Sequence, residues 1–413
     1  MKRTLLHVLG VVAVMVFAGA VFFIACSSSS TNTSRQAAEG GLTTQKGMAG
    51  EDDDYSFFGY ESANDVGSEE LGDLLEVRTL DVAALLANDT ASDSMILATA
   101  EYLFPVTVRG TIIESIRVMD IEGDWEYISS ESKGEIEKAL ELISANSLNQ
   151  DSCYILEVDE IGLAFVGYES DGHVMLIPLY TTTSPELTSG TKYVFTAIAP
   201  ALKTEVQTSK GEKNDLKPPS SISLTPSEVI EAAFATEIKA SGKTSKLLGV
   251  TLAGQEQDNW CWAASGRMTM LYAGGDSTTI TQCAQANLAF SQSTCCTNGA
   301  TTACNKPYYP EYNKWGFSFT YTDDTAPTWK ALKGLMDSGK PLVFLWMWNE
   351  GGGHAMVAVG YYEDTTTNTK MVNMIDPWPP NVGKKSSITY ASFVGGTGYN
   401  YTFGGYYTNV TKN

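Results

Sequence analysis

The sequence is short of histidine and of positive charge, and both shortages limit what this protein can do. Only three histidines occur in 413 residues, so chemistry that depends on an imidazole has few candidates. Lys and Arg number 27 against 48 acidic residues, a formal net charge of −21. Such a chain would be repelled by a phosphate backbone, so we expect no nucleic-acid partner. A hydrophobic content of 43% is still ample for sizeable cores, and the length favours two folded domains plus extensions.

The N-terminus combines a basic start, an apolar run and a cysteine. Lys2 and Arg3 precede an uncharged apolar run over residues 8–25, and Cys26 follows. This order is typical of a bacterial lipoprotein signal, so residues 1–26 are predicted to be that signal and Cys26 the lipidated residue. An uncleaved membrane helix is the alternative, because the run is long enough to span a bilayer. Either outcome predicts an extracytoplasmic protein of the cell envelope, anchored to the membrane at its N-terminus.

Three segments of different composition follow. Residues 27–76 are rich in Ser, Thr and Gly and carry acidic clusters, which predicts a flexible acidic linker. Residues 77–207 predict a small α+β domain with a helix on one face, a three-strand meander from Cys153 to Tyr180 and a strand over 193–198. An inhibitory propeptide and a partner-binding module are both open as its role. Residues 208–224 are predicted to be a second linker.

The stretch from Gln255 to Ser265, QEQDNWCWAAS, carries the clearest chemical signal. Cys261 opens an apolar run with helical spacing that stops at Gly274-Gly275. A cysteine in the first turn of a helix lies beside unpaired backbone N–H groups and the positive end of the helix dipole, which favour the thiolate. Gln255 stands six residues earlier in a loop, from which its amide could donate to an oxyanion.

His354 is the histidine best suited to serve this cysteine as a base. It follows three glycines and opens a β-rich run, whereas His7 lies in the N-terminal apolar segment and His173 beside a turn. A histidine at the mouth of a strand can face a cysteine on a helix and take its proton. The next strand ends at Asp376, whose carboxylate could fix the tautomer of His354.

This combination resembles the papain-like cysteine peptidases: Gln-x5-Cys-Trp-Ala, then His-Ala opening a strand, then a polar residue close to a Trp. The Asp-Asn-Trp-Cys-Trp-Ala-Ala variant and a downstream Cys-Cys pair resemble a bacterial branch that includes secreted effector proteases of plant pathogens. Asp376 stands where papain has Asn. The resemblance covers residues from about Leu252 to the C-terminus. It implies a papain-like two-lobed domain over residues 225–413, with Cys261 on a helical lobe and His354 and Asp376 on a β lobe.

The implied function is a thiol protease that hydrolyses protein or peptide substrates through an acyl-enzyme, with no cofactor and no metal. Two alternatives remain. A cell-wall amidase or transamidase would use the same Cys–His pair on another substrate. A non-catalytic, surface-binding lipoprotein would keep only the peptidase scaffold. Subsite preference and oligomeric state leave no pattern in the sequence.

Four further cysteines lie in a short polar region of an exported chain, and they predict two disulfides. They are Cys283, Cys295, Cys296 and Cys304. Three pairings are possible, although a bond between the adjacent residues would be strained, and their spacing fits tetrahedral zinc poorly. Two such bridges would stabilise the helical half of the fold near the cleft.

Overall fold

The computed structural model describes residues 33–50, 55–121, 123–183, 185–213, 242–349, 351–396 and 399–413. The predicted signal with Cys26 and residues 214–224 of the predicted second linker lie outside this set. In the part of the chain that the structure describes, no helix is long and apolar enough to cross a bilayer. We call residues 33–213 the N-terminal part and residues 242–413 the C-terminal part.

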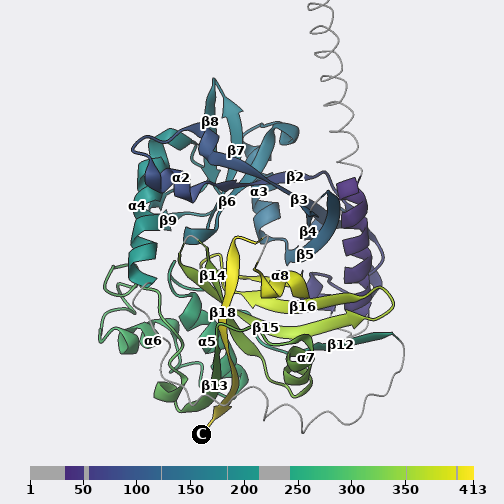
Figure 1. Ribbon diagram of the computed structural model, residues 1–413, viewed down its shortest axis with the longest axis vertical. Coiled ribbons are helices and arrows are strands. Elements are labelled where there is room, and N and C mark those ends of the chain that lie inside the picture. The colour runs from purple at the N-terminus through teal and green to yellow at the C-terminus, as the bar shows by residue number, and fades with distance from the viewer. Residues whose placement is uncertain are drawn as a thin grey trace, which may run out of the picture.

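One sheet of 16 strands runs through both parts (Figure 1). Its path in the N-terminal part is β11 (Tyr193–Val194), β8 (His173–Pro178), β7 (Leu163–Ser170), β6 (Cys153–Val158), β2 (Leu75–Leu80), β3 (Ile96–Val108), β4 (Thr111–Ile121) and β5 (Asp124–Ser132). It continues in the C-terminal part with β17 (Lys384–Thr389), β16 (Thr369–Asp376), β15 (Gly353–Asp364), β14 (Leu342–Trp348), β18 (Tyr401–Lys412) and β13 (Phe317–Asp323). Two strands branch off this path, β1 (Glu69–Leu71) beside β3 and β12 (Lys243–Leu247) beside β15.

Helices cover both faces of the sheet in the N-terminal part. In β6, Ile155 faces the core that contains α3 (Gly134–Ala145), whereas Leu156 faces the core that contains α4 (Phe195–Lys213) and α2 (Val82–Ala87). This alternation follows from the two-residue period of a strand. The predicted meander is confirmed as β6, β7 and β8, but the prediction of a helix on one face only is wrong.

The strand predicted over residues 193–198 is also wrong beyond Val194, because α4 begins at Phe195. Phe195, Ala199, Leu202 and Val206 are buried at helical spacing on one side of this helix. The six-residue run from Tyr193 to Ile198 is too short to separate a strand from the start of a helix by composition. The helix extends through residue 213, so the first part of the predicted linker 208–224 is helical.

The predicted flexible linker over residues 27–76 needs a correction where the structure describes it. Residues 33–50 are helical, and Phe57, Phe58 and Tyr60 are buried in the largest hydrophobic core. Two of the acidic residues described here are paired with cations: Glu69 bonds the ammonium of Lys46 at 2.8 Å, and Asp65 bonds Arg109 at 2.7 Å. Compositional acidity predicted an extended chain because it does not reveal these long-range partners.

The remaining elements complete the C-terminal part and the connections. The α-helices are α5 (Cys261–Tyr272), α6 (Gln282–Ala289), α7 (Trp329–Asp337) and α8 (Tyr390–Val394). Short 3-10 turns are η1 (Tyr55–Phe58), η2 (Ala63–Asp65), η3 (Asp93–Met95), η4 (Gln150–Ser152), η5 (Asp159–Ile161) and η7 (Tyr312–Trp315). A separate pair of strands is formed by β9 (Thr182–Thr183) and β10 (Glu186–Leu187).

The two parts of the chain are joined by strand pairing and by a shared core. β17 pairs with β5 in antiparallel register, with Ser386 opposite Glu131 and Ile388 opposite Ser129. The largest hydrophobic core contains residues of both parts, among them Phe104 and Ile375. The molecule is therefore of the predicted α+β class, built around a sheet that crosses the boundary between the parts.

Candidate active site

The start of α5 is held by two tryptophans on either side of Cys261. Trp260 and Trp262 are each 1% exposed. Their indole N–H groups donate to the carbonyls of Cys304 at 2.9 Å and Lys306 at 3.1 Å. Burying an indole requires a partner for its N–H, so these bonds fix both rings. Cys261, which is half-buried, is thereby fixed in direction at the first residue of the helix.

The loop that accepts these bonds is cross-linked. Cys295 is bonded to Cys304, and Cys283, on α6, is bonded to Cys296. The prediction of two disulfides is confirmed, and the structure selects one of the three possible pairings. Cys153 is a buried thiol without a disulfide. The bridges therefore stabilise the loop against which the start of α5 is packed, as the position of these cysteines in the sequence predicted.

α5 is also fixed to the strand that carries His354. The hydroxyl of Ser265, one turn after Cys261, donates to the backbone carbonyl of Ala355 at 2.9 Å in a fully buried contact. Ala355 directly follows His354 in β15. The helix and the strand therefore approach each other at the two residues that the sequence singled out, and His354 is hydrogen-bonded to Cys261.

Asp376, the last residue of β16, holds the far side of the imidazole. His354 Nε2 lies 2.6 Å from Asp376 Oδ1, and the same oxygen accepts the backbone N–H of Trp378 at 2.8 Å. Because Nε2 is engaged by the carboxylate, Nδ1 is the ring nitrogen that faces Cys261. The carboxylate therefore sets both the tautomer and the orientation of the ring.

This arrangement keeps the imidazole positively charged. Burial alone would lower the pKa of His354, but the charge of Asp376, their hydrogen bond and the contact with Cys261 raise it to about 10. Burial would likewise raise the pKa of Asp376, yet the charge and hydrogen bond of His354, helped by Lys384, hold it below its usual value. The site therefore favours an imidazolium beside the sulfur across neutral pH.

Gln255 does not occupy the position that the sequence suggested. Its side chain is 1% exposed, and its Nε2 donates to the carbonyls of Gln257 at 2.9 Å and Asp258 at 2.7 Å. It is absent from the residues that line the cavity beside Cys261. Its backbone instead joins two loops, since its N–H donates to Pro377 and its carbonyl accepts from Asn381. In this structure Gln255 holds the loop before Cys261 against the loop after Asp376, and both amide hydrogens are used in doing so.

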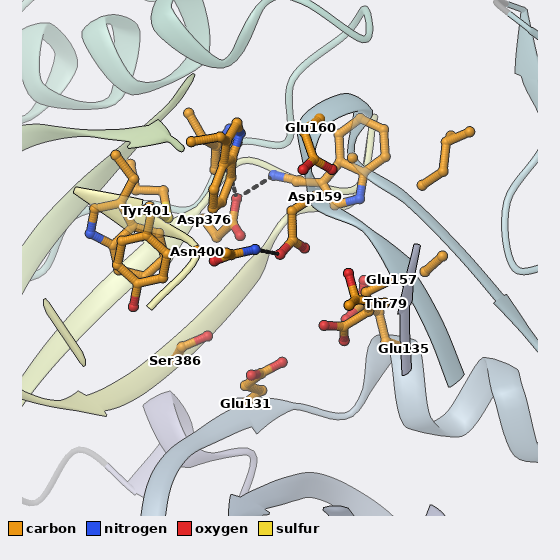
Figure 2. A pocket seen from close by; sticks show the side chains of 18 of the residues that line it. Thr79, Glu131, Glu135, Glu157, Asp159, Glu160, Asp376, Ser386, Asn400 and Tyr401 are labelled. Atoms are coloured by element: carbon orange, nitrogen blue, oxygen red, sulfur yellow. Dashed lines mark hydrogen bonds and ion pairs between the residues drawn. The ribbon is translucent and has the colours of Figure 1, made fainter. Parts of the chain in front are cut away.

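Cys261, His354 and Asp376 line a cavity of about 490 Å³ whose opposite side comes from the N-terminal part. Arg117 of β4 lies there, 8% exposed, and bonds Glu101 at 2.9 Å, Glu131 at 3.2 Å and Glu157 at 2.6 Å. Figure 2 shows two of these carboxylates, those of Glu131 and Glu157, beside the cavity, with Asp376 across from them. Cationic and acidic side chains from both parts of the chain thus surround the space next to the sulfur.

Sequence reasoning missed this charged side of the cavity. Arg117 is a buried cation between Ile116 and Val118 in β4, and Lys384 is the first residue of β17. The Lys384 ammonium bonds Glu131 and Glu135, each at 3.2 Å, across the boundary between the parts. The available signal was a charged residue at a core position of a strand, because such residues are seldom buried without partners. Which residues would be those partners depends on tertiary packing.

Comparison with protein families gives one match and places the candidate residues inside it. Residues 247–403 match the model described as the Peptidase_C39 like family. This span contains Cys261, His354 and Asp376, and the match supports a cysteine peptidase, a hydrolase, in this part of the chain. It does not identify the narrower branch of plant-pathogen effectors. A search of curated proteins found no match.

Proposed function

We propose that this protein is a membrane-tethered, extracytoplasmic cysteine endopeptidase that uses Cys261, His354 and Asp376. The observation that carries the proposal is the chain of contacts from the thiol to His354 and from His354 Nε2 to Asp376 at 2.6 Å, beside one cavity. In this proposal α5 and α6 belong to the helical lobe of a papain-like domain and β13–β18 to its β lobe. The family match over residues 247–403 agrees with a cysteine peptidase.

The mechanism begins from an ion pair between the Cys261 thiolate and the His354 imidazolium. The thiolate attacks the peptide carbonyl carbon, and the oxyanion is stabilised by the backbone N–H of Cys261 in the first turn of α5. His354 then gives its proton to the leaving amine as the C–N bond breaks, which leaves a thioester. His354 next takes a proton from water, which attacks the thioester; the C–S bond then breaks, which releases the acid and restores the thiolate–imidazolium pair. Asp376 stays ionised and orients the ring throughout.

Membrane tethering is part of the proposal and rests on the sequence. The two disulfides are typical of proteins that fold outside the cytoplasm, which agrees with export. Lipidation of Cys26 would hold the exported chain at the membrane, whereas Cys26→Ala should release it into the soluble fraction or leave its signal uncleaved. Mass spectrometry of the N-terminal peptide distinguishes the lipidated from the uncleaved form.

Labelling of the intact protein by an epoxysuccinyl inactivator tests the catalytic assignment, with Cys153 as an internal control. Neither Cys261 nor Cys153 forms a disulfide, but Cys153 is buried and burial raises its pKa, so it should react slowly. We expect Cys261 to be labelled at least about a hundredfold faster, and His354→Ala to remove most of the difference. Equal labelling of the two thiols would refute the catalytic reading and leave a surface-binding lipoprotein. Rapid labelling with cleavage of muropeptides but not of unfolded proteins would favour the amidase or transamidase alternative.

A further inference from the structure

The cavity beside Cys261 has more acidic than basic groups around it. Nine Asp or Glu residues line it, against three Lys or Arg residues. Arg117 and Lys384 pair with four of these carboxylates, those of Glu101, Glu131, Glu135 and Glu157. The lining therefore stays acidic even when His354 is counted as charged.

Asp159, on η5, faces the cavity without a cation of its own. Its carboxylate accepts the side-chain N–H of Asn400 at 2.6 Å, and no Lys or Arg in the described ranges pairs with it (Figure 2). Burial, and then the charge of Glu157, raise the pKa of Asp159. Burial also raises the pKa of Glu101 to about 7, even though Arg117 opposes the change. The raised pKa values of both carboxyl groups agree with a cavity that has too few cations for its carboxylates.

The C-terminal part contributes aromatic side chains to the same cavity. Tyr401 of β18 is stacked on Trp346 of β14, with ring centroids 4.0 Å apart, and Trp348 meets Tyr401 edge-on at 5.7 Å. All three residues line the cavity. Aromatic faces attract cations, so carboxylates on one side and indole and phenol rings on the other form a binding surface for a positively charged group.

Ser386 supplies a separate indication of a missing ligand. Its side chain is 3% exposed, and its hydroxyl oxygen has no hydrogen-bond partner among the described residues. Figure 2 shows this hydroxyl directed into the space between Tyr401 and Glu131. A buried hydroxyl without a partner is uncommon, and here it can accept a hydrogen bond from an N–H donor that enters the cavity.

We propose that this cavity is a substrate subsite for the cationic side chain of an Arg or Lys residue, with Asp159, Ser386 and Tyr401 among its contacts. The proposal rests on the cysteine peptidase function proposed above and adds a class of substrate to it. It also assigns a role to the N-terminal part, which contributes the acidic side of the subsite.

The relation of the N-terminal part to the cavity favours this role over that of a removable inhibitor. An inhibitory segment fills the cleft, whereas here about 490 Å³ remains beside Cys261, a volume typical of ligand pockets. The η5 loop bounds this space, and Gly162 at its end lies so close to Trp378 that a Cβ there would be 3.3 Å from the indole ring. The same loop that carries Asp159 is therefore packed onto the loop that follows Asp376.

The test compares peptidyl epoxide inactivators that carry Arg with otherwise identical ones that carry citrulline, its neutral isostere. The residue is placed at each of three positions next to the reactive group, and the full chain is used. We expect Arg to accelerate labelling of Cys261 at least about fivefold over citrulline at one position, because one charge contact is gained in a partly enclosed site. A smaller preference at all three positions overturns the proposal.

A pair of matched variants tests whether the acidic side is responsible. Asp159→Asn keeps an oxygen for Asn400 and removes the charge, so the Arg-to-citrulline ratio should fall at least about threefold. Asp151→Asn makes the same change at an exposed position of the N-terminal part and should leave the ratio unchanged. A ratio that survives Asp159→Asn refutes this assignment, and if that variant does not fold, the ratio of the unmodified chain decides.

Iodoacetamide separates failure of the subsite from failure of the proposed function. This small reagent reports the reactivity of Cys261 without using the subsite. Rapid alkylation of Cys261 with no preference for Arg would leave the peptidase function standing and refute the subsite. Alkylation no faster than that of Cys153 would refute the catalytic function itself, and with it a substrate subsite at this cavity.

Discussion

The protonation state of His354 determines how stability and activity depend on pH at this site. Its pKa is raised from 6.5 to about 10, chiefly by Asp376 against the opposing effect of burial. Because the folded value is the higher one, the ion pair stabilises the fold fully below about pH 6.5. That contribution is lost as the pH rises through about 10. The alkaline limit of activity should follow the same deprotonation, because the leaving amine needs the proton of His354.

Replacing Asp376 tests this dependence. Asp376→Asn removes the negative charge, so the pKa of His354 should fall and the alkaline limb of kcat/KM should move at least about one pH unit towards neutrality. A pH–rate profile measures the shift. Asp337→Asn is a matched control, since Asp337 is exposed on α7 and accepts only the hydroxyl of Tyr361 in the same part of the chain. An alkaline limb that stays in place in Asp376→Asn would contradict the assigned role.

For single residues of the site, the position predicted from local sequence pattern agrees with the structure in some cases and not in others. Cys261 begins α5, Asp376 ends β16 and His354 is the second residue of β15. The ends of elements can be read from glycines and hydrophobic periodicity. Gln255 was predicted to donate to an oxyanion, but spacing alone cannot show where an amide points. In the structure its amide donates to two nearby carbonyls, those of Gln257 and Asp258. Arg117 was missed because its three carboxylate partners are distant in the chain.

Between elements, the contact of α5 with β15 includes one buried hydrogen bond, from Ser265 to Ala355. Ser265→Ala leaves the carbonyl of Ala355 without this donor, and we expect a loss of roughly 1–2 kcal/mol in the free energy of unfolding. The rate of Cys261 labelling should fall as well, since α5 and His354 lose a direct connection. Urea denaturation measures the first effect. The control is Ser338→Ala at the exposed residue that follows α7: its hydroxyl donates to the carbonyl of Gly334, and its loss should cost less than about 0.5 kcal/mol.

Removing each of the two disulfides should affect the labelling of Cys261 differently, because the two bonds hold different elements. Cys295→Ala/Cys304→Ala should cost roughly 2–3 kcal/mol and slow the labelling of Cys261, because Cys304 accepts the indole N–H of Trp260 at the start of α5. Cys283→Ala/Cys296→Ala should cost a similar amount, because its loop is of comparable length, but should leave the labelling rate nearly unchanged. Thermal unfolding and labelling kinetics check both pairs. Equal rates of Cys261 labelling in the two double variants would show that the Cys295–Cys304 disulfide does not position Cys261.

How well an element could be predicted depended on whether its own residues determine it. The β6–β8 meander and helix α5 have clear periods and turn residues, and both predictions are confirmed. The helix over residues 33–50 escaped prediction because its glycines and polar residues disfavour a helix in isolation. Its packing is tertiary: Gly41 lies under the ring of Tyr127, where a Cβ would be 2.3 Å from the nearest ring carbon.

For the whole molecule, the sheet that joins β5 to β17 makes the two parts one folding unit. Removing the N-terminal part would expose the edge of β17 and leave Lys384 without Glu131 and Glu135. It would also open the core that Phe104 shares with Ile375. A cut within Lys243–Lys246 would in addition divide β12, which pairs with β15. The structure therefore disfavours activation by release of the N-terminal part at that segment.

Cooperative unfolding of the intact chain is the resulting prediction. Seven of the eight tryptophans lie in the C-terminal part and only Trp125 in the N-terminal part, so tryptophan fluorescence reports mainly on the former while far-ultraviolet circular dichroism reports on both. Because the parts share a sheet and a core, the two signals should give the same urea midpoint. Residues 242–413 expressed alone should be insoluble or should unfold at a much lower urea concentration, since an open strand edge and part of the core face water. Two separate transitions, or a stable and active C-terminal fragment, would show that the parts fold independently and would restore the propeptide as a removable inhibitor.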